Sequence, residues 1–204
     1  MIHNLDSTLR TLLQRDLPTG LSQQVSISFD PPDDQFPPTS VSLPAIDLFL
    51  YDVRENLELR SNEWLVQRDG RGSATRFPPA VRIDCSYLIT AWPSASAPNS
   101  AMDEHMLLGE VMLVLLRYPK IPAEVLQGRL RQTGDQNPPL PATALQPGHL
   151  QSVGEFWQAL GGKPKSALNY TVTIAVQPGV AVEAPLAVES NVDLRPATPD
   201  GSRP

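Results

Sequence analysis

The chain has 204 residues, of which 41% are hydrophobic and 19% charged, as expected for one folded soluble domain with a real core. Its net charge of −6 argues against nucleic-acid binding, because affinity for phosphates depends on clustered lysines and arginines. The 22 prolines are roughly twice the usual share of about 5%. Since proline ends helices, we expect many fixed bends and extended connections.

Cysteine content and apolar runs bear on where the protein folds. Cys85 is the single cysteine, which excludes an internal disulfide and fits synthesis in a reducing cytoplasm. The start of the chain lacks the positive charge and the apolar run of a signal peptide, so none is expected. The longest apolar run, residues 111–116, is far too short to span a bilayer.

The first predicted elements are a helix and two strands. The helix is predicted at the start of the chain, where four leucines have the spacing of one helix face: Leu5, Leu9, Leu12 and Leu13. Asn4 or Asp6 is expected to cap this helix, and residues 16–18 to end it. Alternating apolar residues predict a strand at 25–29. A nearly continuous apolar run at 45–53 predicts a central strand covered on both faces.

A charged hairpin, a long strand and a long helix follow. Residues 54–68 alternate charged and apolar groups and lead to a glycine turn at 69–72, which predicts the hairpin. Residues 81–92 have the strongest strand pattern, at period two. Its expected inward set is Val81, Ile83, Cys85, Tyr87, Ile89 and Ala91. Asp103 and Glu104 open a helix that is apolar almost all round, so we expect it to be buried on more than one side.

The remaining elements are shorter. Residues 125–132 are predicted to form a strand, and residues 134–149 a proline-rich loop. The capping-box spacing of Ser152 and Glu155 predicts a short helix at 153–160 that ends at a glycine pair.

The last predicted strand marks the end of the globular part. It covers residues 167–176, and the composition then changes to proline-rich. The predicted organisation is one α+β globular domain at 1–177 and an extended, proline-rich tail at 178–204 that can dock on another surface.

No pattern concentrates catalytic or metal-binding groups. The three histidines lie in different elements, and Asp103-Glu104-His105 fits a helix start better than a metal site. Cys85 is expected to be buried and inert. The acids of the 30–38 loop lack the spacing of a calcium-binding EF-hand. We therefore expect no catalytic residue, no metal and no cofactor.

The best candidate for a functional surface is the long, charged and amphipathic segment at 51–64. Arginine and tryptophan are enriched at interface hot spots, so protein contact is one interpretation. A solvent-facing hairpin with cross-strand ion pairs is the other, and both stay open. The candidate contact residues are Arg54, Glu55, Glu58, Arg60, Glu63 and Trp64.

Several sequence blocks occur in a characteristic order from about residue 2 to residue 176. They are Tyr51 to Asn56, Leu59 to Trp64, the strand that ends in Thr90-Ala91-Trp92, Asp103-Glu104-His105 with Leu107-Leu108, Leu126-Gln127-Gly128, Phe156 to Gly162, and Lys165 to Tyr170. Together they resemble the DUF4255 family, also called the Pvc16 N-terminal domain family. Several blocks in order are far more specific than one motif.

The resemblance implies a cap, or tail terminator, of a contractile injection system, which is a phage-tail-like particle. Members are similar in fold to phage tail terminators, with a mixed, largely antiparallel β-sheet flanked by helices. The implied role is a sixfold ring at the baseplate-distal end of the inner tube and sheath, which ends polymerisation and anchors the last sheath layer. Implied partners are copies of itself, the tube protein and the sheath protein, without nucleic acid or membrane insertion.

Elementary physics agrees with this role, since exposed strand edges keep recruiting subunits and a closed head-to-tail ring ends such growth. The implied site of assembly is the cytoplasm, within a particle that is either retained or released. Two alternatives stay open. One is an adaptor for cargo or assembly of the particle, and the other is a hydrolase with a scattered site formed by Asp84, Cys85 and His105.

Overall fold

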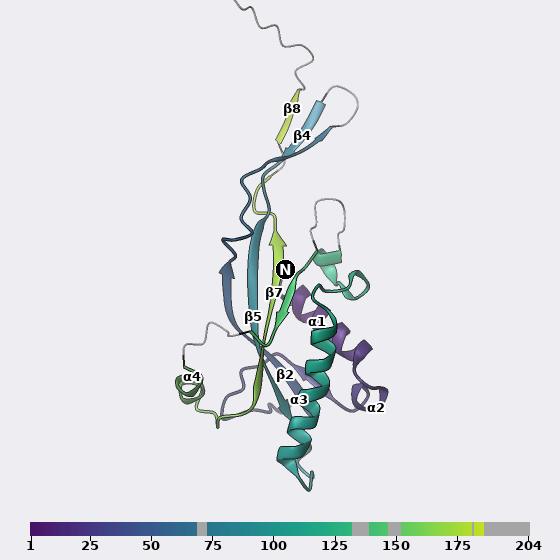
Figure 1. Cartoon of the computed structure of the whole chain (residues 1–204), viewed down its shortest axis with the longest axis vertical. Helices are drawn as coiled ribbons and strands as arrows, with labels where there is room; N and C mark the ends of the chain where they lie inside the picture. The colour runs from purple at the N-terminus through teal and green to yellow at the C-terminus, as the bar shows by residue number, and fades with distance from the viewer. Residues whose placement is uncertain (69–72, 132–138, 147–151, 181, 186–204) are drawn as a thin grey trace, which may run out of the picture. The chain divides into compact units, whose positions relative to one another are not determined.

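The structure is a computed structural model that describes residues 1–68, 73–131, 139–146, 152–180 and 182–185 (Figure 1). The chain divides into two compact units. The first comprises residues 1–60 and 80–176, and the second comprises residues 61–79 together with residues 177–204.

A five-stranded sheet forms the centre of the first unit. Its strands are β1 (Ser26–Ser28), β2 (Ala45–Glu55), β5 (Val81–Trp92), β6 (Ala142–Ala144) and β7 (Ala167–Val176), in the spatial order β1-β2-β5-β7-β6. Only the β1–β2 pair is parallel, and the other pairs are antiparallel. The predicted α+β fold, with a mixed and largely antiparallel sheet flanked by helices, is therefore confirmed. The predicted bounds of the 81–92 and 167–176 strands are also confirmed.

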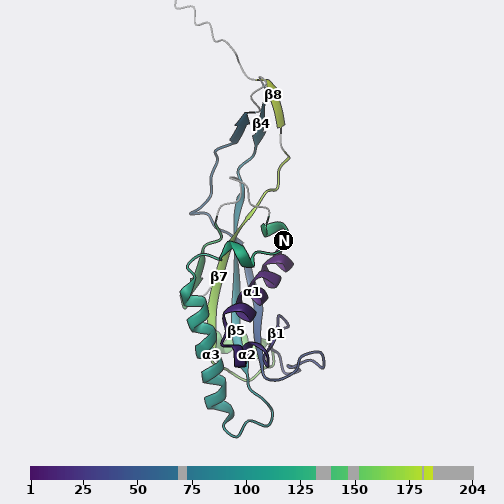
Figure 2. The ribbon, with the colours of Figure 1, turned by 90° about the vertical axis from the view of Figure 1, so that its right-hand side faces the viewer.

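Helix α1 (Ile2–Asp16) and helix α3 (Ser100–Arg117) lie on one face of this sheet, as Figures 1 and 2 show. The α1 leucines predicted to face the core are all fully buried, and a short helix, α2 (Thr19–Ser22), follows. The predicted caps are wrong, because the helix begins at Ile2 without a side-chain cap. Asn4 and Asp6 lie within its first turns instead.

The packing of α3 corrects a second prediction. Its buried side consists of Leu107, Leu108, Val111, Val114 and Leu115. Its opposite side is open, with exposed fractions of 64% at Met102, 53% at Met106, 55% at Leu113 and 51% at Leu116. The helix therefore buries one face only, because it packs on a single side of the sheet.

The other face of the sheet is covered in part by α4 (Val153–Ala159) (Figure 1). The predicted capping box is confirmed on one side, since the Glu155 amide donates to the Ser152 hydroxyl over 3.2 Å. Trp157 is buried, and the Phe156 ring lies 6.2 Å from that of Phe49 on β2. The helix ends before Gly161, whose φ of 70° suits glycine.

Three predictions about the connecting segments are corrected. The predicted strand at 125–132 is wrong: two short 3₁₀ helices, η1 (Ala123–Val125) and η2 (Gly128–Arg131), occupy this stretch. Gly128 has a φ of 53°, which an extended strand does not accommodate. The predicted proline-rich loop contains β6, and the first predicted strand is shortened to β1.

The second unit contains a three-stranded antiparallel sheet in the order β3-β4-β8. Strand β3 (Leu65–Arg68) pairs with β4 (Ser73–Phe77), and the predicted hairpin tip at 69–72 lies outside the described residues. Strand β8 (Val182–Pro185) pairs with β4 and was not predicted. Residues 186–204 of the predicted tail also lie outside the described residues.

Candidate assembly surfaces

The loop after β2 is held by an ordered set of polar contacts. The Arg60 guanidinium donates two hydrogen bonds of 2.8 Å to the carboxylate of Glu55, and these bonds lower the pKa of Glu55. The Asn56 amide group donates to both oxygens of Asp84 on β5, over 3.2 and 3.0 Å. The Leu59 backbone amide in turn donates to Asn56 Oδ1 over 3.0 Å. The loop therefore has a defined shape although it contains no strand.

The six predicted contact residues are divided between the two units. Arg54, Glu55, Glu58 and Arg60 belong to the first unit, whereas Glu63 and Trp64 belong to the second. The predicted hairpin at 54–68 is corrected, because β2 pairs with β5 and β3 pairs with β4. Trp64 is 45% exposed, and the guanidinium carbon of Arg76 lies 5.3 Å from the centre of its ring.

Apolar side chains accompany the charged ones at the end of β2 and on the loop that follows it. Val53, Leu57 and Leu59 are 45%, 66% and 45% exposed. These three apolar residues were not among the predicted contact residues. Their alternation with Arg54, Glu58 and similar groups was the signal that could have identified them.

The open side of α3 forms an apolar stripe, which we define as Met102, Met106, Gly109, Leu113 and Leu116. From Met102 the others follow after four, seven, eleven and fourteen residues, which is the heptad spacing of a helix-packing seam. A side chain added at Gly109 would meet nothing within 4 Å, so the middle of the stripe is open. A contiguous exposed apolar patch of this kind marks a site of protein contact.

The outer edge of β2 is the third candidate surface. Strand β1 pairs only with Ala45, Ile46 and Asp47, and no other described strand pairs with that edge. Beyond Asp47, this edge of β2 therefore has no partner strand within the described part of the chain. Such edges are templates for pairing with another chain.

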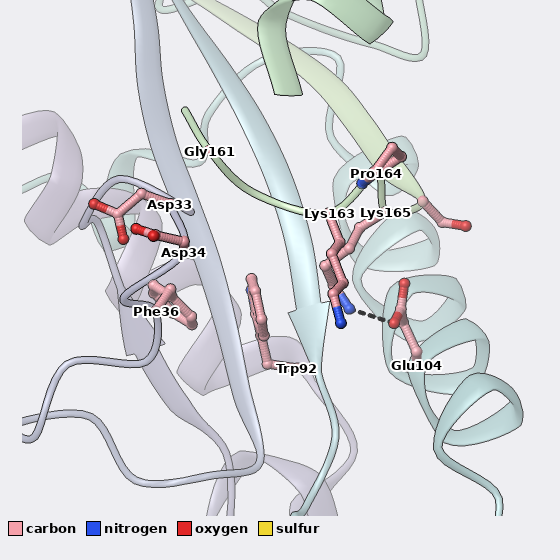
Figure 3. Close-up of a pocket in the computed structure, with 10 residues that line it drawn as sticks. Asp33, Asp34, Phe36, Trp92, Glu104, Gly161, Lys163, Pro164 and Lys165 are labelled. Carbon is pink, nitrogen blue, oxygen red and sulfur yellow. Dashed lines mark hydrogen bonds and ion pairs between the residues drawn. The ribbon is translucent and has the colours of Figure 1, made fainter. Parts of the chain in front are cut away.

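A cleft of about 540 Å³ lies in the first unit between the loop at 33–36 and the segment at 161–166 (Figure 3). The ring of Phe36 lies 4.4 Å from that of Trp92, centre to centre. Lys165 lies 4.5 Å above the Trp92 ring and forms an ion pair with Glu104 of α3. Trp92 Nε1 also donates to the Thr90 hydroxyl over 2.9 Å. The aromatic floor of the cleft is thus fixed in position.

The walls of the cleft have opposite charges. Asp33 and Asp34 lie on one side of Trp92, and Lys163 lies on the other (Figure 3). Asp33 Oδ1 accepts a hydrogen bond of 2.9 Å from the Gln35 amide. Within the described residues, neither Asp34 nor Lys163 has an ion-pair or hydrogen-bond partner, and both are exposed. These two charges are available to a bound group.

The three residues of the hydrolase alternative are not brought together. Cys85 is fully buried, and burial raises the pKa of its thiol to about 11. Its neighbour Asp84 points to the opposite face of the strand and accepts a 2.6 Å hydrogen bond from the Thr173 hydroxyl. His105 is exposed on α3.

The described residues contain no group of three or more His, Cys, Asp or Glu side chains that could hold a metal ion. Asp30, one of the loop acids considered for calcium, instead accepts a 2.7 Å hydrogen bond from the Ser28 hydroxyl. None of the described helices is both long and apolar enough for a membrane span.

Comparisons with known proteins agree on one family. The chain is similar to the PVC sheath/tube terminator of an extracellular contractile injection system, in its extended state. The TM-score is 0.69 and the identity 27%, over 99% of this chain and 65% of that one. It is similar in fold to the tube-terminating cap of the anti-feeding prophage, with a TM-score of 0.62 and 24% identity, over 93% of this chain and 60% of that one.

The chain thus spans less than two thirds of the length of both solved proteins. No curated protein matches it. Residues 4–190 match the sequence profile of the Pvc16 N-terminal domain, and the chain therefore belongs to the Pvc16 N-terminal domain family.

Proposed function

We propose that this protein is a structural subunit of the cap that terminates the tube and sheath of a contractile injection system. The observation that carries the proposal is its likeness to a sheath/tube terminator over 99% of its own length, with a TM-score of 0.69 and 27% identity. The proposed partners are copies of itself, the tube protein and the sheath protein. No chemical step belongs to this role.

The proposed assembly is a sixfold ring at the baseplate-distal end of the particle. A ring closes when each copy joins the next through two unlike surfaces, as in other head-to-tail assemblies. The first unit offers the apolar stripe on α3 and, on a different element, the loop with Leu57 and Leu59. We assign these two surfaces to contacts within the cap. The predicted residues Glu63 and Trp64 are assigned to contacts made by the second unit.

The open edge of β2 supports the same proposal. A growing tube or sheath ends in unsatisfied surfaces, and a terminator has to cover them without offering an equivalent surface for further growth. An edge strand that pairs with a neighbouring subunit meets the first requirement, and closure of the ring meets the second. Assembly takes place in the cytoplasm, and the finished particle is either retained or released.

The decisive experiment is electron microscopy of particles from a strain that lacks this gene. The expected result is tubes of uncontrolled length, or tubes without a stable sheath, and normal particles when the wild-type gene is restored. A variant with Leu113→Glu serves as the matched comparison, because it alters only the apolar stripe. Particles of normal length and sheath stability in the deletion strain would refute the proposal.

A further inference from the structure

We propose that the cleft floored by Phe36 and Trp92 receives the basic end of α3 from a second copy of this chain. The basic end comprises Leu116, Arg117 and Lys120. The inference rests on the proposed function in requiring that copies associate, and it deepens that function by naming two surfaces that meet. Both surfaces belong to the first unit.

The basic end of α3 combines one apolar side chain with two cations. Leu116 is 51% exposed and is the last member of the apolar stripe. Arg117 ends the helix, Lys120 follows three positions later, and both are exposed. Neither forms an ion pair or a side-chain hydrogen bond with another described residue. Asp16 lies near enough to Arg117 for their charges to interact, but it is already bonded to Arg15 over 2.7 Å.

The cleft offers the complementary arrangement (Figure 3). Its floor is aromatic, and its acidic wall contains Asp33 and the exposed Asp34. Lys165 is already paired with Glu104, so the free cation of the cleft is Lys163 on the opposite side. The volume of about 540 Å³ is within the range of small-ligand sites, roughly 300 to 1,000 Å³. The cleft therefore admits a few side chains from the end of a helix, not the length of one.

The match of charges fixes the orientation of the neighbouring copy. Its Arg117 and Lys120 pair with the acidic wall at Asp34, and its Leu116 lies against the aromatic floor. The carboxyl end of a helix has free backbone carbonyls and a partial negative charge, so the end of α3 also suits Lys163. The reverse orientation would bring Lys163 against the two cations, which like charges disfavour.

The occupant has to come from another copy, because α3 itself separates the two surfaces. Glu104 lines the cleft near the start of the helix, whereas Arg117 is its last residue. Arg117 follows Glu104 by 13 positions, or about 20 Å at 1.5 Å per residue. Each copy can thus offer its basic end to one neighbour and its cleft to another, as a closed head-to-tail ring requires.

The first test exchanges the charges of this contact in the full chain and follows association by sedimentation velocity. Asp34→Lys should weaken association about tenfold, since a cation then meets the basic end. Lys120→Asp should weaken it to a similar extent, and the chain that carries both substitutions should recover most of the loss. The matched control combines Asp34→Lys with Arg10→Asp, which reverses an exposed cation on α1 and should restore nothing.

The second test joins the two residues chemically in the wild-type protein. A carbodiimide couples a lysine amine directly to an adjacent carboxylate, with loss of water and without a spacer. Protein made with ordinary nitrogen is mixed with protein made with heavy nitrogen, treated, digested and measured by mass spectrometry. We expect a link between Lys120 and Asp34 in fragments of mixed isotope content, which form only between copies.

Three outcomes would overturn the proposal. The first is that no mixed-isotope link between Lys120 and Asp34 forms up to about 1 mM protein. The second is that the chain with both substitutions associates no better than Asp34→Lys alone, and the third is that the Arg10→Asp control restores association equally well. None of these results depends on tubes or sheaths. Copies that associate through other surfaces would leave the terminator proposal intact, and the deletion strain decides that proposal separately.

Discussion

The hydroxyl of Tyr87 donates a 2.7 Å hydrogen bond to Oδ1 of Asp6, and so joins the middle of β5 to the first helix. Tyr87 is fully buried, and the two residues are 81 positions apart in the sequence. Burial raises the pKa of Asp6, and the bond from Tyr87 opposes that rise. This contact adds a polar link between α1 and the sheet to the packing of the buried leucines of the helix.

Removing that hydroxyl should destabilise the first unit. Tyr87→Phe leaves the Asp6 carboxyl partly buried without its donor, at an expected cost of about 1–3 kcal/mol in the free energy of unfolding. Urea denaturation followed by circular dichroism measures the loss. The added cost of Tyr87→Phe should largely disappear in a protein that already carries Asp6→Ala, since the two residues then have no bond to lose. Fully additive losses would contradict a direct coupling.

Stability should depend on pH through Asp47, whose side chain is fully buried on β2. Burial raises its pKa from 3.8 to about 7 in the folded protein. The folded state therefore binds more protons than the unfolded state between about pH 4 and pH 7, so stability falls as the pH rises through this window and is level above it. Asp47→Asn removes the ionisation and should flatten the dependence.

The expected gain of Asp47→Asn is at most about 4 kcal/mol at pH 8, from about three pKa units. At pH 4 most of the gain should be gone, because aspartic acid is then protonated in the folded state and close to half protonated in the unfolded state. Urea titrations of both proteins at pH 4, 6 and 8 provide the measurement. Parallel pH profiles for the wild type and the variant would show that Asp47 does not hold its proton in the fold.

The apolar stripe on α3 should govern association and contribute little to folding. Leu113→Glu places a charge on a position that is 55% exposed, so the melting temperature should change little while oligomers disappear. Light scattering coupled to size-exclusion chromatography measures the mass at matched concentrations. Leu145→Glu is the control, because Leu145 is 45% exposed and lies outside α3. Equal masses for the wild type and Leu113→Glu would remove the stripe from the interface.

Variants of the Glu55–Arg60 ion pair test whether these residues contact a neighbouring subunit or only solvent. The side chains are 31% and 55% exposed, so Arg60→Glu should hardly alter the melting temperature. If the pair faces a neighbouring subunit, the variant should nevertheless lose ring formation in the same chromatographic measurement. The exchange Glu55→Arg with Arg60→Glu restores the internal pair. Persistent loss in the exchanged protein would identify an outside partner, whereas unchanged rings in Arg60→Glu would exclude this pair from the interface.

The elements predicted correctly from the sequence are those whose spacing of apolar residues matches the faces that the fold buries. Strands β5 and β7 have period-two patterns and pair with neighbours along most of their length, so both bounds were found. The leucines of α1 likewise mark one face that the sheet covers. Strands β6 and β8 were not predicted. They have only three and four residues and lie near prolines, so they are strands only because β6 pairs with β7 and β8 pairs with β4.

The candidate surfaces were harder to predict, for a physical reason. The composition of α3 indicates a helix that is apolar all round, but whether its far side is covered depends on packing and not on the helix itself. The cleft combines Phe36, Trp92, Glu104 and Lys165 from four separate segments, so no local motif announces it. The contact of Asn56 with Asp84, which shapes the charged loop, also joins distant positions.

The apolar stripe on α3 has a consequence for the life of a newly made copy. Until its neighbours arrive, that copy carries a seam of methionine and leucine in contact with water, and such seams promote precipitation as concentration rises. Production of the lone polypeptide should therefore give poor yields. Co-production with the components that bury the seam should keep it in solution, so the supply of partners sets how much of this protein a cell can hold.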